Sequence, residues 1–120
     1  MAAKIADYQV QRKCNSIILG IGIQNAVMDV ATNMDCLKIC LKLLTDAHMG
    51  SVDAEMGRFG EFTVALGIDA KDETSIFIDG PQIEGIRGLS AAIWVEKSDL
   101  RRIIELIINS PSDIKGASRA

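Results

Sequence analysis

This chain has little net charge, few aromatic residues and an odd number of cysteines. Each of these features argues against a class of protein. The 13 basic residues face 16 acidic ones, which leaves a net charge of −3. Because binding to a phosphate backbone needs a basic stripe, we expect no nucleic-acid partner. A dense acidic run of the kind found in disordered acidic tails is missing as well.

The chain also lacks the marks of secretion and of membrane insertion. Its three cysteines are an odd number, and the opening residues MAAKIADYQVQRK do not have the basic-then-apolar order of a signal peptide. The most apolar stretch, residues 17–30, is interrupted by three polar residues and is too short to span a bilayer. We therefore expect a cytoplasmic protein with free thiols and no membrane partner.

Aliphatic residues are plentiful. Hydrophobic residues make up 48% of the chain and aromatic residues only 4%, and the mean hydropathy is +0.20. A small domain has too little interior to bury so much aliphatic surface. We therefore expect part of it to be covered by a second copy, as in a homodimer, or by another protein.

The 120 residues fit one domain, and no repeat or low-complexity linker divides them. Pro81 falls in a glycine-rich loop, and Pro111 follows a predicted helix. After Pro111 the chain is rich in serine, glycine and alanine. The sequence predicts a single α+β domain over residues 1–110 and a flexible C-terminal tail over residues 111–120.

Two segments have the 3.6-residue period of amphipathic helices. The first is predicted over residues 35–49, capped by Thr32 or Asn33 and ended by Gly50. The second is predicted over residues 99–109, with Ser98 as its N-cap and Pro111 as its stop. Their apolar stripes are Cys36, Ile39, Cys40, Leu43, Leu44 and Ala47 in the first, and Leu100, Ile103, Ile104, Ile107 and Ile108 in the second.

Three segments alternate with the period of strands. Residues 62–69 and 74–79 are separated by a polar turn and predict a hairpin. Residues 90–96 predict a third strand, which leads directly into the second helix. Residues 15–31 permit two interpretations. We favour a strand, a turn near Gln24 and then a second strand, because a helix would contain two glycines at a cost of about 2 kcal/mol.

These elements predict an α+β fold with a single antiparallel or mixed sheet of four to five strands and two amphipathic helices on one face. Gly20 and Gly22 lie on one face of the favoured strand, where missing side chains would let a helix approach closely. The Gly-Ile-Gly run is not a dinucleotide fingerprint, since Asn25 stands where the third glycine would be.

Cys36, Cys40 and His48 are spaced so that they can share a helix face, and Cys14 could complete a set of zinc ligands. The spacing is not that of a zinc finger, however, and the two helical cysteines also fit an apolar stripe. We favour core residues, with His48 as a helix-end cap, and we expect no metal and no cofactor. A Cys–His nucleophile is disfavoured because no orienting acid is evident.

Two loops place an arginine beside glycines, namely residues 57–61 and residues 80–88. Arginine suits forked recognition of carboxylate or phosphate groups, and loops on a rigid sheet often carry binding residues. If the loops meet, they form a candidate ligand-binding site for a small anion, made of Arg58, Glu61, Glu84 and Arg87. The competing interpretation is an ordinary surface network of ion pairs.

The leading functional hypothesis is a non-enzymatic binding or interaction protein that self-associates, because no catalytic constellation is present and a hairpin can present a sheet edge. The first alternative is a sensor or sponge for an anionic metabolite or nucleotide, which would use the two arginine loops. The second alternative is a small enzyme with His48 as its acid or base and Asp46 nearby in the sequence.

Overall fold

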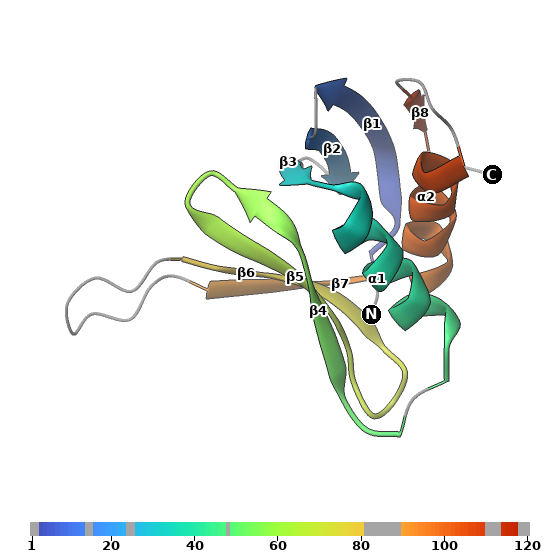
Figure 1. The fold of residues 1–120 in the computed structure, drawn as a ribbon. Coiled ribbons are helices and arrows are strands. Elements are labelled where there is room, and N and C mark those ends of the chain that lie inside the picture. Colours follow the sequence, from blue (N-terminus) through green and yellow to red (C-terminus); the bar gives the residue numbers. More distant parts are fainter. Residues whose placement is uncertain are drawn as a thin grey trace.

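In a computed structural model, residues 3–13, 16–23, 26–47, 49–80, 90–109 and 114–117 are described. They form eight strands and two helices (Figure 1). In chain order these are β1 (Ile5–Lys13), β2 (Ser16–Ile23), β3 (Ala26–Thr32), α1 (Met34–Thr45), β4 (Val52–Phe59), β5 (Phe62–Ile68), β6 (Thr74–Asp79), β7 (Ser90–Val95), α2 (Lys97–Asn109) and β8 (Ile114–Ala117).

All eight strands belong to one sheet with the order β7-β6-β5-β4-β3-β2-β1-β8. Every pair of neighbouring strands is antiparallel. The predicted α+β class is therefore confirmed, but the predicted sheet of four to five strands is wrong. Three strands were missed: β1 and β4, and β8, which lies within the predicted tail. Neither strand keeps a regular alternation along its whole length, because Arg12 and Lys13 interrupt it in β1 and Gly57 and Arg58 interrupt it in β4.

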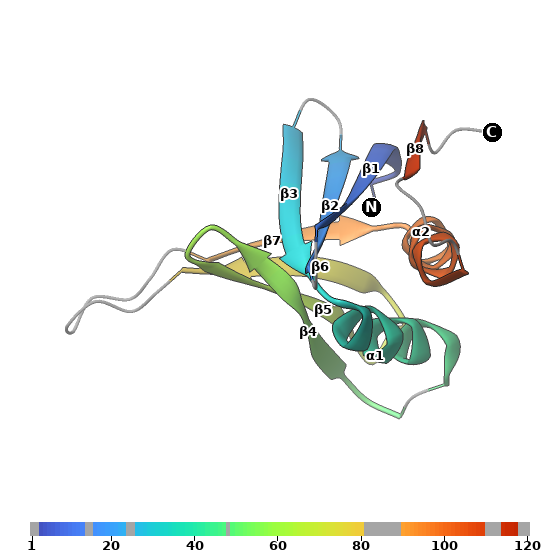
Figure 2. The ribbon, with the colours of Figure 1, turned by 45° about the horizontal axis from the view of Figure 1, so that its top comes forward.

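The sheet divides into two halves whose strands run in clearly different directions (Figure 2). The halves are β8, β1, β2 and β3 on one side and β4 to β7 on the other, and they join where Ala31 of β3 pairs with Arg58 of β4. Ala3 makes an isolated parallel bridge to Val95 of β7. The sheet is thus bent so far that the residue two positions before β1 reaches β7.

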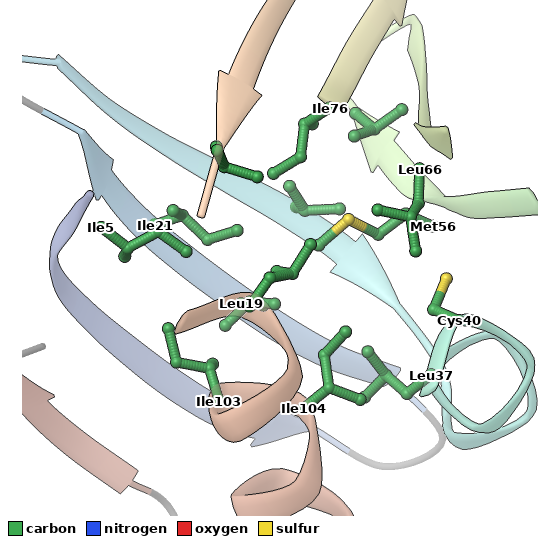
Figure 3. Close-up of a cluster of buried hydrophobic side chains, with 14 of the residues drawn as sticks. Ile5, Leu19, Ile21, Leu37, Cys40, Met56, Leu66, Ile76, Ile103 and Ile104 are labelled. Atoms are coloured by element: carbon green, nitrogen blue, oxygen red, sulfur yellow. The ribbon is translucent and has the colours of Figure 1, made fainter. Parts of the chain in front are cut away.

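The core fills the space between the two halves and the helices. Figure 3 shows Leu19 and Ile21 of β2 facing Leu66 and Ile76 of the other half. The helices complete the core with side chains that are fully or almost fully buried, namely Leu37, Cys40 and Leu44 from α1 and Leu100, Ile103, Ile104 and Ile107 from α2. Burial of this much aliphatic surface is the main force that stabilises the fold.

Strand β2 confirms the favoured interpretation of the N-terminal third. Ile17, Leu19 and Ile21 are buried on its core face. The expectation that a helix packs on the glycine face is wrong. An added Cβ at Gly20 would lie 2.8 Å from Oδ1 of Asp29, and one at Gly22 would meet the carboxylate of Asp7. The glycines thus make room for two aspartate side chains from the neighbouring strands.

Both helices are present with shifted ends. Asn33 caps α1 as predicted, since its Oδ1 accepts a hydrogen bond of 2.9 Å from the N–H of Cys36. The helix ends at Thr45, before Gly50, because Asp46 is already extended. Ser98 is not the cap of α2: the helix begins at Lys97, and the N–H of Leu100 donates to the carbonyl of Glu96. Ile39, expected in the apolar stripe, is 57% exposed, because Leu37 points into the core instead.

Candidate functional site: the open edge of strand β7

Of the four residues predicted to bind a small anion, Arg58 and Glu61 lie at the turn between β4 and β5. The Arg58 side chain is exposed, and its Nη2 donates to the backbone carbonyl of Glu61 over 3.3 Å. Beside them the rings of Phe59 and Phe62 stack with centroids 6.4 Å apart. The guanidinium is therefore used within its own hairpin. Glu84 and Arg87 lie outside the described residues, so the convergence of the two loops stays a prediction.

The cysteines of α1 have different surroundings. Cys40 is fully buried, and its Sγ donates to the carbonyl of Glu55 over 3.6 Å. Burial, with a smaller contribution from Cys36, raises the pKa of the Cys40 thiol to about 12. The neutral thiol is therefore the stable form, and a thiolate nucleophile or metal ligand is disfavoured at this position. Cys14 and His48 lie outside the described residues, and within those residues no cluster of three metal-binding side chains occurs.

An open groove of about 670 Å³ lies between the end of α1 and the start of α2. Its cations are all placed beside acids. Lys97 contacts Asp72 at 2.8 Å, Arg101 contacts Glu105 at 2.9 Å, and Arg102 contacts Asp99 at 3.7 Å. The last helix thus presents a solvated face whose charges are paired. Each of the three cations thus already has an acidic partner, which is typical of an ordinary surface network of ion pairs.

Strand β7 is the last strand at one end of the sheet, so one of its two sides faces away from β6. Ala3 covers only the last part of this side: its N–H donates to the carbonyl of Trp94 over 2.8 Å, and its carbonyl accepts from the N–H of Glu96 over 3.0 Å. We call the side of Ser90–Trp94 that faces away from β6 the β7 edge. Among the described residues, none pairs with the part of it before Trp94.

The bond to Ala3 shows which backbone groups point outward along the β7 edge. The carbonyl of Trp94 points away from β6, and backbone groups in a strand change sides at every residue. The N–H and C=O of Ser90 and Ala92, and the N–H of Trp94, therefore point outward too. The groups of Ala91 and Ile93 point toward β6, where they complete the ladder with Ile78 and Ile76.

The side chains of the β7 edge do nothing to prevent pairing. Residues 90–94 read Ser-Ala-Ala-Ile-Trp and contain neither charge nor proline. Ser90, Ala91 and Ala92 are exposed, and Trp94 is 40% exposed. Sheet proteins usually protect their edges with lysine, proline or a bulge. The opposite edge strand, β8, is shorter, with four residues.

Sequence reasoning missed this surface although it predicted the strand itself. The signal that could have found it is the uncharged run from Ser90 to Val95, which is unusual for a strand with one solvated face. Such a run is equally typical of an interior strand, whose two neighbours would cover it. The order of the strands decides between the two, and the sequence does not contain it directly.

Comparisons with family models, with curated proteins and with solved structures found no match to this chain. Among the described helices, neither is long and apolar enough to cross a membrane.

Proposed function

We propose that the protein is a non-enzymatic interaction protein that self-associates, and that it does so through its sheet. The observation that carries this proposal is the β7 edge, five residues without charge or proline. Apart from the carbonyl of Trp94, which Ala3 occupies, its outward backbone groups pair with no other strand among the described residues. An edge of this kind is a template for adding another strand, which is a common way for proteins to bind one another.

The surroundings of the edge support the proposal. On the outer face of the sheet, Trp94 and Ala92 of β7 lie beside Ser75 and Phe77 of β6. The ring of Phe77 lies over Gly67 of β5, where an added Cβ would come within 2.9 Å of it. These five residues carry no charge, so an uncharged part of the outer face adjoins the edge, and an added strand would lie beside it.

We also propose the cellular compartment in which the protein works. Cys36 and Cys40 are free thiols, and free thiols persist in a reducing compartment. We place the protein in the cytoplasm, where an exposed edge has many possible partners and a second copy of the chain competes with them for pairing.

Sedimentation velocity tests self-association directly. With increasing protein concentration over roughly 1–100 μM, the range expected of a small interface, a species of twice the 13.0 kDa chain mass should become populated. A chain that stays monomeric throughout this range would remove the proposed function. A monomeric protein of similar mass, run in the same buffer, controls for non-ideal sedimentation.

A further inference from the structure

Building on the proposed self-association, we infer that the partner of the β7 edge is the β7 edge of a second copy, paired antiparallel about a two-fold axis through Ala92. In this arrangement Ala92 of one chain faces Ala92 of the other, Ser90 faces Trp94, and Ala91 faces Ile93. The two eight-stranded sheets would join into one continuous sheet across the dimer.

The limits of the edge select this register. At one end Ala3 occupies the position beside Val95, so a pairing strand has to stop opposite Trp94. Within the described residues, which resume at Ser90 after residue 80, the open stretch runs from Ser90 to Trp94, and an antiparallel pairing of these five residues with themselves is centred on Ala92. A two-fold axis at that point also makes the contact self-complementary, as closed dimers require.

The backbone groups agree with this register. Ala92 has both its N–H and its C=O directed outward, so two facing Ala92 residues exchange two hydrogen bonds as an antiparallel pair does. Each Trp94 N–H faces the carbonyl of Ser90 in the other copy, which adds two more. A register shifted by one residue would pair the outward groups of one strand with the inward-pointing groups of the other.

Side-chain size provides the argument for a second copy of this chain in particular. Centring on Ala92 places the large Trp94 opposite the small Ser90 on the outer face, and Ile93 opposite the small Ala91 on the inner face. Cross-strand neighbours of this kind lie about 5 Å apart, so a large and a small side chain fill the space without collision. No like charges meet, because the stretch has none.

Cysteine cross-linking tests the register. Facing residues of such a pair have Cα atoms about 5.5 Å apart, within the range that a disulfide bridges. Ala92→Cys should therefore give a covalent dimer under mild oxidation. Ser90→Cys is the matched control, since it is equally exposed but lies about 14 Å from its own counterpart at about 3.4 Å per residue. The wild-type chain gives the background from its native cysteines.

Proline substitution tests the edge itself. Ala92→Pro removes an outward N–H and leaves the ladder with β6 complete, because the backbone groups of Ala92 do not point to β6. Loss of one hydrogen bond from each copy should weaken the dimer roughly thirtyfold. Ile39→Lys is the control, since it alters an exposed apolar residue on α1 and should leave the dimer unchanged. Circular dichroism checks that each variant keeps its fold.

The outcomes separate this inference from the proposed function. A wild-type dimer with efficient cross-linking through Ala92→Cys and weakened association in Ala92→Pro supports both. A wild-type dimer that Ala92→Pro does not weaken, or that cross-links equally through Ser90→Cys, overturns the inference and leaves self-association standing. A wild-type monomer overturns both, and it is also the result expected if the edge takes a strand from a different protein.

Discussion

At the scale of single residues, Cys40 shows how burial decides what a side chain can do. Its thiol lies at the junction of α1 and β4, where it donates to the carbonyl of Glu55. Burial, followed by the proximity of Cys36, raises its pKa from the ordinary 9.0 to about 12. The folded chain therefore holds the proton more tightly than the unfolded chain does.

This difference predicts a loss of stability in alkali. Below pH 9 the thiol is protonated in both states, and the contribution of Cys40 is fully present. As pH rises from about 9 toward 12, the unfolded chain releases the proton first, so the free energy of unfolding falls. Melting temperatures of the wild type should drop more steeply from pH 8 to pH 10 than those of Cys40→Ala. Parallel curves for the two proteins would contradict the prediction.

At the scale of elements, the start of each helix is determined by local hydrogen bonds that the sequence indicates only in part. Asn33 caps α1 through its side chain, while Ser98, an equally good capping residue, lies inside α2. The chain leaving β7 continues directly into α2, and the carbonyl of Glu96 accepts the first helical hydrogen bond. The geometry of the incoming strand thus overrides the preference of serine for the cap.

The two capping residues provide a matched pair of substitutions. Asn33→Ala removes the acceptor for the N–H of Cys36 and should lower the free energy of unfolding by about 1 kcal/mol. Ser98→Ala should change it by less than about 0.5 kcal/mol, because no cap is lost. Urea denaturation of both variants checks the difference. An equal or larger loss in Ser98→Ala would show that the helix begins at Asp99, two residues later, as its sequence predicts.

The strands differ in how readily their sequences reveal them. Strands β2, β5, β6 and β7 were predicted from their alternation, which burial against the core produces. In β4, Val52 and Ala54 alternate with acids, but a register shift near Gly57 ends the pattern early. In β1, the half-buried Arg12 stands on the same face as the buried Val10. An arginine there breaks the binary pattern, although its Nη2 usefully donates to the carbonyl of Ile107 in the last turn of α2.

At the scale of the whole molecule, two contacts join the beginning of the chain to α2. Arg12 bonds the end of α2, and near its start Oδ2 of Asp99 accepts from the N–H of Ile5 over 3.3 Å. Ile5 is fully buried, so its N–H has no access to water as a substitute partner. The Asp99 carboxylate also lies where the positive end of the helix dipole favours it.

Asp99→Ala should therefore be costly. It leaves the N–H of Ile5 buried without its acceptor, which lowers the free energy of unfolding by about 1–3 kcal/mol. Glu105→Ala on the same helix removes an exposed ion pair with Arg101 and should cost less than about 0.5 kcal/mol. Thermal and urea unfolding of the two variants measure both values. Similar losses would mean that Asp99 acts only as a surface charge.

The β7 edge exists only because of how the whole sheet is assembled. This explains why the sequence by itself did not reveal it. Whether Ser90–Val95 is an interior strand or an edge depends on the order of all eight strands, and that order follows from contacts between distant segments. The residues chosen from the sequence, Arg58 and Glu61, were selected by chemical type within local loops. Local reasoning favours such groups, while an uncharged edge is defined by what lies beside it.

The joining of the two ends of the chain also has a consequence for how the protein is made. Ile5 and Asp99 are 94 positions apart, and Arg12 and Ile107 are 95 apart. Contacts between such distant positions require closure of almost the whole chain, and proteins rich in them fold slowly, in milliseconds to seconds. During synthesis, β1 and β2 are made well before α2, which helps to cover their apolar faces in the folded protein. Until then the nascent chain exposes them, and it is at this stage that chaperones would have most to bind.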